Sequence, residues 1–389
     1  MREAFLVRKS RRHDELKIAE LAAYVDSDDC VHDLDALLSG VFDFPLPRQV
    51  MLRKSHSDRR RIVYVYPERQ NALMKYLAWG MHEYDGIFSD SLYSFRLNRG
   101  VADLFRKIAD ANYARDLYTV KADVHDYGHS IRPDLLVPML RDIMGQRDPA
   151  LLAFLECLLG RNEFLRNGAV QHGSMGGLPG VPVGSFLNNV YLMRLDEAME
   201  RRAVLCSRYA DDIAVFTRTR EEAEEALAEL QDIVGGLGLT LNEEKTQIIK
   251  PGDDVELLGI EIRDGEFDVA DSTMAKARTK LTHYANKLVR KEQRNEMTKQ
   301  AAAQYMAQRI KKYFDGVDEG NHQLCWKDYF FPVLTRPDSL YEIDHMCQGL
   351  LRYVGTGKRG DARYRFRYKD MKALGYRPLV PEYFAMHDR

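Results

Sequence analysis

One stretch of the chain reads Ser207-Arg208-Tyr209-Ala210-Asp211-Asp212-Ile213-Ala214-Val215-Phe216, with two adjacent carboxylates between short apolar runs. The flanking residues 203–209 and 213–217 are rich in Val, Ile, Phe and Tyr, which predicts two strands. The Asp pair then lies at the tip of a hairpin. Adjacent carboxylates repel each other unless a positive group binds them, so the pair points to a divalent cation. Taken alone, such a pair is also typical of an ordinary turn.

A further carboxylate ends an alternating apolar segment upstream, Leu117-Tyr118-Thr119-Val120-Lys121-Ala122-Asp123. A polar turn follows, which places Asp123 at or near a strand end, where its side chain can reach a shared metal site. Two-metal phosphoryl transfer uses carboxylates from different strands to bridge cations about 3.5–4 Å apart. Mg²⁺ suits such an all-oxygen site because it retains water and binds through one or two carboxylates plus phosphates. The three acids therefore predict nucleotidyl transfer.

The chain resembles the reverse transcriptases in a series of motifs that follow the order of that family. The two fingers motifs and motifs A to E are matched, in turn, by Arg61-Ile62-Val63, Tyr93-Ser94-Phe95-Arg96, Asp123 with Ser130-Ile131, Gly177-Leu178-Pro179-Gly180-Val181-Pro182 with Leu187-Asn188-Asn189 and Leu195-Asp196, Tyr209-Ala210-Asp211-Asp212, Gly238-Leu239-Thr240-Leu241-Asn242-Glu243-Glu244-Lys245-Thr246, and Leu257-Leu258-Gly259-Ile260. The YxDD box of motif C is weak support by itself, whereas the ordered series is specific.

The resemblance implies an α+β fold with the plan of a right-hand polymerase. Its parts would be an N-terminal extension at residues 1–45, fingers at 46–120, a palm with an RRM-like antiparallel sheet at 121–262, and an α-helical thumb with a C-terminal extension at 263–389. Basic sequence at helical spacing between 271 and 313 fits a thumb that grips a primer–template, although a solvated helix pair has the same pattern.

The resemblance also implies roles for individual residues. Asp123, Asp211 and Asp212 would be catalytic, and together with Val124 they would hold Mg²⁺, with Mn²⁺ as an alternative. Lys245 matches the lysine of motif D, which relatives use beside the leaving pyrophosphate as a charge stabiliser or proton donor. A surface lysine in a Glu-Glu-Lys turn would have the same local sequence.

A basic hairpin is predicted between Val50 and Arg69, where aromatic and β-branched residues are interleaved with Arg and Lys. This composition suits an incoming triphosphate and a template backbone. By resemblance, Arg61 would hold the nucleotide triphosphate, and Lys54 is a second candidate. A solvated charged hairpin is the alternative interpretation.

Glycines are concentrated between Gly173 and Gly184, where the absence of Cβ would let the backbone approach a base pair or sugar closely. A flexible loop is the alternative. By resemblance, Gly180 and Asn189 would bind substrate. The run departs from the family, because Pro179 stands where most relatives have Gln and Gly184 where they have Ser. The pocket for the nascent base pair is therefore expected to differ.

Motif A contains a second departure. Relatives place a bulky Tyr or Phe five residues after the first Asp, and its ring excludes a ribose 2′-hydroxyl. In this register the gate position is Gly128, with Tyr127 beside it. The sequence therefore predicts either weak sugar discrimination or discrimination by Tyr127.

Composition agrees with a nucleic-acid enzyme and excludes other classes. The chain has 389 residues, 45% of them hydrophobic, and a formal net charge of −2. No apolar run approaches the roughly 18 residues of a membrane span, and the N-terminus lacks the apolar core of a signal peptide. Five scattered cysteines without CxxC spacing favour reduced thiols in the cytoplasm over a zinc site.

Among reverse transcriptases, the chain looks most like the bacterial defence-associated "unknown group". The features are a compact catalytic core, an altered motif B and a C-terminal Leu374-Gly375-Tyr376 run, with no match to RNase H, maturase or retron elements. Members of that group act against phage, often with a noncoding RNA template, and some work beside a second reverse transcriptase. Alternating Arg and aromatic residues at 363–368 also predict contact with structured RNA, although an exposed basic strand would look the same.

The expected partners are an RNA template, dNTPs and a DNA product, with a second reverse transcriptase or a homo-oligomer as further candidates and no membrane. Two other functions remain open at this stage. Gly128 is compatible with an RNA-directed RNA polymerase or a mixed-sugar polymerase. A catalytically inactive RNA-binding scaffold on the same fold is the other alternative, but it has no need for three mutually repelling acids.

Overall fold

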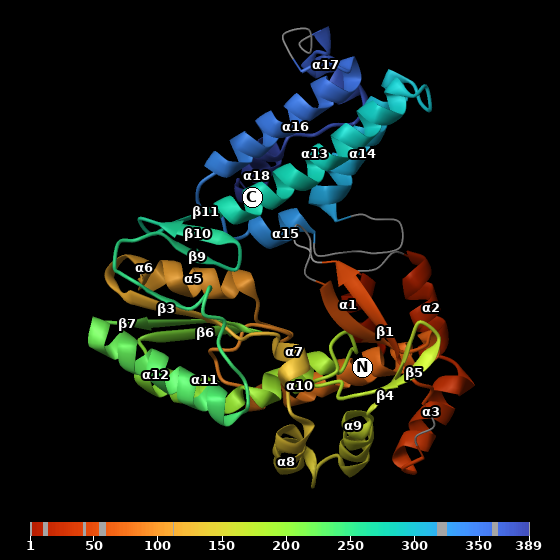
Figure 1. Ribbon diagram of the computed structural model, residues 1–389, viewed down its shortest axis with the longest axis vertical. Coiled ribbons are helices and arrows are strands. Elements are labelled where there is room, and N and C mark those ends of the chain that lie inside the picture. Colours follow the sequence, from red (N-terminus) through yellow and green to blue (C-terminus); the bar gives the residue numbers. More distant parts are fainter. Residues whose placement is uncertain are drawn as a thin grey trace. The chain divides into compact units, whose positions relative to one another are not determined.

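The computed structural model describes residues 2–10, 15–41, 44–53, 60–111, 113–316, 325–359 and 365–388. The chain divides into two compact units, and the boundary falls between Asp253 and Asp254 (Figure 1). The expected boundary between palm and thumb lay later, after residue 262. The strands that match motif E therefore belong to the second unit.

The palm sheet is the central layer of the first unit. It has the strand order β6-β7-β3-β8, and all neighbours are antiparallel. The bounds are β3 Tyr118–Asp123, β6 Leu205–Tyr209, β7 Asp212–Thr217 and β8 Gln247–Ile249. The two strands predicted around the Asp pair are thereby confirmed, and so is the antiparallel palm.

Two helices, α11 (Met193–Arg202) and α12 (Arg220–Gly236), contact strands of the palm sheet (Figure 1). Thr219 caps α12, because its side chain accepts a hydrogen bond from the Glu222 backbone N–H. The buried positions of α12 recur at intervals of three or four residues, which gives one apolar face toward the sheet: Ala223, Ala226, Leu230 and Val234.

A second sheet in the first unit has the order β2-β1-β4-β5. Its strands are β1 Arg48–Arg53, β2 Arg60–Val65, β4 Glu163–Arg166 and β5 Ala169–His172. The backbone N–H of Leu165 donates to the Pro47 carbonyl at 2.8 Å, which joins the β4–β5 hairpin to β1. This sheet thus combines a hairpin from the span expected to form the fingers with a hairpin from the span expected to form the palm.

Helices fill the remainder of the first unit. Phe5 is fully buried, and its ring packs edge-on against Tyr76 at 5.3 Å, so the N-terminal helix is anchored on α4. The helices not yet given are α1 Arg2–Ser10, α2 Glu15–Val25, α3 Asp28–Leu38, α4 Glu68–Gly80, the 3₁₀ helix η1 Met81–Ile87, α5 Val101–Ala111, α6 Tyr113–Asp116, α7 Tyr127–Ser130, α8 Pro133–Met144, α9 Pro149–Gly160 and α10 Gly184–Tyr191.

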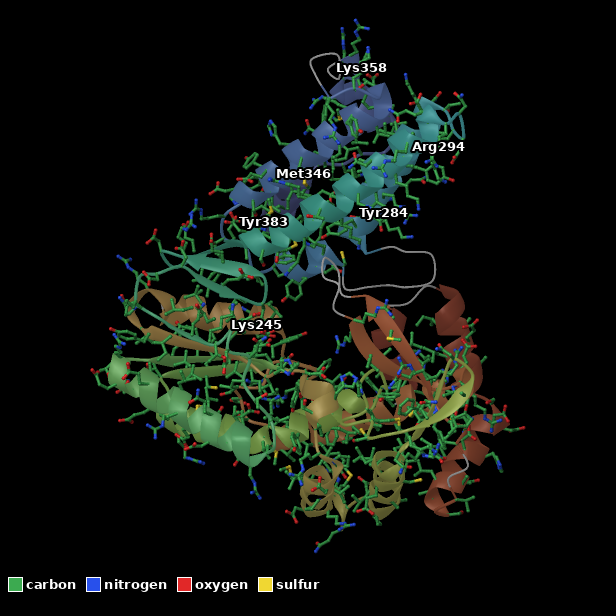
Figure 2. The ribbon with its side chains drawn as sticks, in the orientation of Figure 1. Lys245, Tyr284, Arg294, Met346, Lys358 and Tyr383 are labelled. Atoms are coloured by element: carbon green, nitrogen blue, oxygen red, sulfur yellow. The ribbon has the colours of Figure 1, made fainter. Side chains whose placement is uncertain are left out.

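The second unit combines a small sheet with a helical bundle in which α13, α14 and α16 contact one another. Figure 2 shows Arg294, after α13, and Lys358, after α16, at the same end of this unit. Its elements are β9 Val255–Leu257, β10 Ile260–Arg263, β11 Glu266–Val269, α13 Asp271–Gln293, α14 Lys299–Asp315, α15 Trp326–Phe330, α16 Asp338–Thr356, α17 Tyr368–Ala373 and α18 Leu379–His387.

Several sequence expectations can be checked directly. Among the described residues, no helix is long and apolar enough to cross a membrane. All five cysteines lie in the described ranges, and none forms a disulfide. Of the run at 363–368, residues 363 and 364 lie outside the described residues.

Candidate active site

Strand register brings the three predicted acids to one place. Asp123 is the last residue of β3 and stands opposite Asp212, the first residue of β7. Asp211 precedes Asp212 in the turn between β6 and β7, and its carbonyl accepts a hydrogen bond from the Val124 backbone N–H at 3.3 Å. Segments almost ninety residues apart in the chain therefore converge because β3 and β7 pair.

The turn that carries the Asp pair is strained. Tyr209 pairs with Asp212, which leaves a two-residue loop formed by Ala210 and Asp211. Ala210 has a φ of 58°, the sign that primed hairpin turns require at their first loop residue. Glycine is usual at such positions, and an L-residue with a Cβ costs roughly 1–2 kcal/mol in the left-handed region. Contacts from the surrounding structure must hold this conformation.

Lys245 contacts the acid group directly. Its ammonium Nζ donates to Asp123 Oδ1 at 2.7 Å, and Asn242 Nδ2 donates to Asp123 Oδ2 at 3.3 Å. The Asn242 backbone N–H also donates to the Asp123 carbonyl at 2.7 Å, so the segment after α12 is bound to the end of β3. Figure 2 shows Lys245 beside the palm strands. The predicted motif D lysine and motif A acid are thus hydrogen-bonded neighbours.

The charges at this site act on one another. Burial, together with the negative charges of Asp211 and Asp123, raises the pKa of Asp212 to about 6. Burial and the Asp123 charge also raise the pKa of Asp211, against smaller opposing effects of a backbone hydrogen bond and of the charges of Lys245 and Arg61. Partial burial lowers the pKa of Lys245, but the hydrogen bond and charge of Asp123 outweigh it and the net shift is upward. The site therefore has an excess of negative charge.

A divalent cation suits this excess, because carboxylate oxygens are the ligands that Mg²⁺ and Mn²⁺ prefer. Within the described ranges, however, no group of three or more His, Cys, Asp or Glu side chains is arranged to hold a metal ion. Asp123 instead points to Lys245 and Asn242. A cation shared by all three acids would require Asp123 to exchange these partners for the metal.

The predicted triphosphate ligands are only partly described. Arg61 lies on β2 with an exposed side chain, and its positive charge acts on the pKa of Asp211. This effect places the guanidinium within electrostatic range of the turn. Lys54 lies outside the described residues.

Gly180 makes a close approach to another part of the chain. Its φ is +89°, and a Cβ at this position would lie 2.7 Å from the Val63 Cβ. The Tyr64 backbone N–H donates to the Pro179 carbonyl at 2.8 Å, so the glycine-rich segment is joined to β2. We expected such a glycine to approach a base pair or sugar. The structure shows β2 in contact there, so packing within the protein already explains why the position needs glycine.

Of the candidates around the sugar gate, Tyr127 and Asn189 are buried and Gly128 is half-buried. A Cβ on Gly128 would lie 3.4 Å from the Pro179 Cβ, and the Gly128 carbonyl accepts a hydrogen bond from Gly177 N–H at 2.8 Å. Tyr127 is 4% exposed and its hydroxyl donates to the Asn188 carbonyl; burial raises the pKa of Tyr127. Asn189 is 1% exposed. The substrate-binding roles that the resemblance implies for Tyr127 and Asn189 stay predictions; within the protein, the two side chains bond to Asn188 and Ser94.

Comparison with known proteins identifies the family. Residues 53–262, more than half of the chain, match the family described as reverse transcriptase (RNA-dependent DNA polymerase). The chain belongs to the reverse transcriptase family. The matched range includes Arg61, the three acids and Lys245.

Individual relatives of this reverse transcriptase are distant. A putative enzymatic polyprotein of cassava vein mosaic virus is 33% identical over 79 residues, which are 20% of this chain and 12% of that protein. A telomerase of Candida albicans, solved with a fragment of telomeric RNA, has a TM-score of 0.46 at 10% identity over 87% of this chain and 64% of the telomerase. An apo telomerase of Candida tropicalis has a TM-score of 0.42 at 13% identity, over 58% and 55% of the respective chains. The chain thus spans less than two thirds of each of these relatives.

Sequence reasoning assigned no role to three buried residues next to the turn of this reverse transcriptase. Arg208 and Asp196 form an ion pair with both side chains fully buried, and Ser94 contacts the backbone of Ala210. One signal was available: Arg208 is a charged residue inside an apolar strand, and a buried arginine needs an acidic partner. The identity of that partner could not be read from the sequence.

Proposed function

We propose that this reverse transcriptase is an active RNA-directed DNA polymerase that adds dNTPs to a primer on an RNA template. The observation that supports this most strongly is the register of the palm sheet, in which Asp123 stands opposite Asp212 and Asp211 occupies the adjoining turn. The family match over residues 53–262 supports the same reaction class. An inactive scaffold is disfavoured, because a chain without catalytic function has no need for three neighbouring acids whose charges raise the pKa of Asp211 and Asp212.

In this proposal, Asp123, Asp211 and Asp212 hold Mg²⁺ or Mn²⁺ beside Val124. When bound, the ions would activate the primer 3′-oxygen and stabilise the leaving pyrophosphate. Lys245 is within reach of the same site through Asp123, where its ammonium can neutralise charge on the pyrophosphate or donate a proton to it. Arg61 supplies an exposed positive charge for the triphosphate.

Primer extension with Mg²⁺, an RNA template and dNTPs tests the assignment. We expect Asp211→Ala and Asp212→Ala to reduce extension by about a thousandfold or more, because each removes charge that the reaction requires. Asp253→Ala is the matched control, since it removes an exposed acid of the same unit. Circular dichroism of all variants establishes that they are folded. Extension that does not depend on either acid would contradict the proposal.

A mixed-sugar or RNA-directed RNA polymerase is a second candidate, and two features favour it. The gate position is Gly128, which has no side chain, and the hydroxyl of neighbouring Tyr127 is already bonded to Asn188. We therefore expect weak discrimination between dNTPs and rNTPs. Incorporation ratios for wild type and Tyr127→Ala, with DNase and alkali digestion of the product, measure it. Strong dNTP selectivity that persists in Tyr127→Ala would exclude both weak sugar discrimination and discrimination by Tyr127.

For the biological role, we propose bacterial anti-phage defence in the cytoplasm with a partner noncoding RNA as template. The support is the resemblance in motif B, where Pro179 and Gly184 replace the usual residues, and in the C-terminal run at 374–376. A second reverse transcriptase or a second copy of this chain is a further candidate partner. Purifying the expressed protein with its bound nucleic acid and sequencing that nucleic acid tests the RNA partner. One uniform transcript supports it, and random cellular RNA contradicts it.

A further inference from the structure

A buried ion pair lies behind the catalytic turn. Arg208, on β6, donates to Asp196, on α11, through Nε to Oδ1 and through Nη2 to Oδ2, both at 2.6 Å. Both side chains are fully buried. Burial raises the pKa of Asp196, whereas the carboxylate of Asp196 raises the pKa of Arg208 against its own burial. Because arginine keeps its proton and the contact is bidentate, we treat the pair as ionised.

The guanidinium of Arg208 also donates to two backbone carbonyls. Its Nη1 donates to the Ala210 carbonyl at 3.2 Å, and its Nη2 donates to the Asn189 carbonyl at 3.1 Å. The backbone of Arg208 is fixed as well, because its N–H donates to Ser91 and its carbonyl accepts from Tyr93. The arginine therefore links the turn to α10, α11 and the segment before α5.

Ser94 contacts the backbone N–H of the same residue, Ala210. Its hydroxyl oxygen accepts a hydrogen bond from the Ala210 N–H at 3.0 Å and donates to Asn189 Oδ1 at 3.2 Å. Asn189 Nδ2 donates to the Ser94 carbonyl at 3.1 Å, so Asn189 orients the serine. Both the N–H and the C=O of Ala210, the residue with φ of 58°, are thus held by buried side chains.

We propose that Ser94 and Arg208, supported by Asp196 and Asn189, are positioning residues that keep Ala210 left-handed and thereby orient the catalytic carboxylates. This inference rests on the proposed polymerase function. A turn that lost these contacts would relax toward negative φ, and the side chains of the next two residues would move with it. Displacement of catalytic groups by about 1 Å can cost on the order of a hundredfold in rate.

Two serines of one segment offer a matched test. Ser94→Ala removes the hydroxyl that holds Ala210, whereas Ser91→Ala removes a similarly buried hydroxyl that donates to Glu200 at 2.7 Å. We expect Ser94→Ala to lower kcat by about 10–100-fold with little change in the KM for dNTP, because the chemical step and not substrate binding is affected. Ser91→Ala is expected to stay within about twofold of wild type.

A second substitution that restores activity distinguishes a positioning role of Ser94 from a role in overall stability. Ala210→Gly in the Ser94→Ala background should restore much of the lost kcat, because glycine adopts positive φ without support. A serine that only stabilised the fold would not be rescued in this way. Equal effects of Ser94→Ala and Ser91→Ala on kcat, or failure of Ala210→Gly to rescue, would overturn the inference. If Ser94→Ala does not fold, the kcat values of Ser94→Cys and Ser91→Cys, and the rescue of Ser94→Cys by Ala210→Gly, are compared in the same way.

A second measurement does not depend on activity: Mn²⁺ binding to the protein is followed by electron paramagnetic resonance in the absence of substrates. We expect Ser94→Ala to weaken Mn²⁺ binding several-fold and Ser91→Ala to leave it unchanged. If wild type shows no extension that depends on Asp211, the proposed function fails while the Mn²⁺ comparison still decides the positioning role. If wild type is active and the two serine variants bind Mn²⁺ equally and extend equally, only the positioning role fails.

Discussion

The two sides of the catalytic hairpin differ in charge: one side carries a neutralised ion pair and the other a cluster of acids. On the buried side, Asp196 and Arg208 neutralise each other, and the guanidinium also donates to the backbone carbonyls of Ala210 and Asn189. On the other side, three acids lie together, and Lys245 donates a hydrogen bond to one of them, Asp123. The buried side therefore supports the fold. The other side carries an electrostatic cost that a bound divalent cation can offset.

The largest expected effect comes from breaking the buried side. Asp196→Ala leaves the Arg208 guanidinium buried without its carboxylate, which should cost about 3–5 kcal/mol of unfolding free energy. Urea unfolding of the full chain, followed by circular dichroism, measures it. Asp134→Ala is the control, because it removes the exposed partner of Arg132 and should cost no more than about 1 kcal/mol. Equal losses in the two variants would contradict the contrast between the two sides.

Replacing an acid at the catalytic turn should raise the free energy of unfolding, whereas replacing Asp196 should lower it. The pKa of Asp212 is raised to about 6 in the folded protein, so the folded state binds more protons than the unfolded state between about pH 4 and 6. Stability of the metal-free protein should therefore fall as pH rises through this window. Asp212→Asn removes this dependence. Allowing for partial exposure, we expect the variant to gain about 1–2 kcal/mol on wild type between about pH 4.5 and 7.5.

Urea unfolding in EDTA at these two pH values makes the comparison. Because the asparagine does not titrate, wild type and variant should differ more at the higher pH than at the lower one. A variant that is less stable than wild type at about pH 7.5, or parallel pH profiles, would show that the raised pKa of Asp212 is not a source of instability.

Lys245 is expected to have two separable effects. Its ammonium occupies Asp123 Oδ1, so Lys245→Ala should strengthen Mn²⁺ binding by about 3–10-fold in the absence of nucleotide, because the metal no longer competes with it. The same variant should extend primers about 10–100-fold more slowly, because the group near the pyrophosphate is lost. Lys250→Ala, which removes an exposed lysine of the same unit, should change neither value. Weaker Mn²⁺ binding in Lys245→Ala would show that the Lys245 ammonium does not compete with the metal for Asp123.

The smallest expected effect concerns the turn itself. Ala210→Gly removes a Cβ from the left-handed region and should raise the unfolding free energy by about 0.5–1 kcal/mol. The same change in an exposed helical position, Ala228→Gly in α12, should lower it by a similar amount. Thermal or urea unfolding measures both. A loss of stability in both variants would mean that Ala210 is not strained.

The sequence identified the three acids and the strand ends that carry them, but not the contacts that the neighbouring residues make. Apolar alternation before Asp123 and around the Asp pair predicted strand ends, and those strands are confirmed. The family resemblance, and not a local pattern, placed Asn189 and Tyr127 at a substrate, and both side chains are buried and form hydrogen bonds within the protein. Glycine spacing predicted a close approach at Gly180, and β2 makes such an approach there through Val63.

By itself, the sequence determined where strands end, which acids stand at those ends and which family the motif order matches. Periodicity and turn residues are local properties, so they are readable within a few residues. Only the tertiary structure decided that Lys245 binds Asp123, that Asp196 neutralises Arg208 and that Ser94 holds the turn. Each of these contacts joins separate elements of the chain, and no local pattern specifies which distant side chain will fill a given buried space.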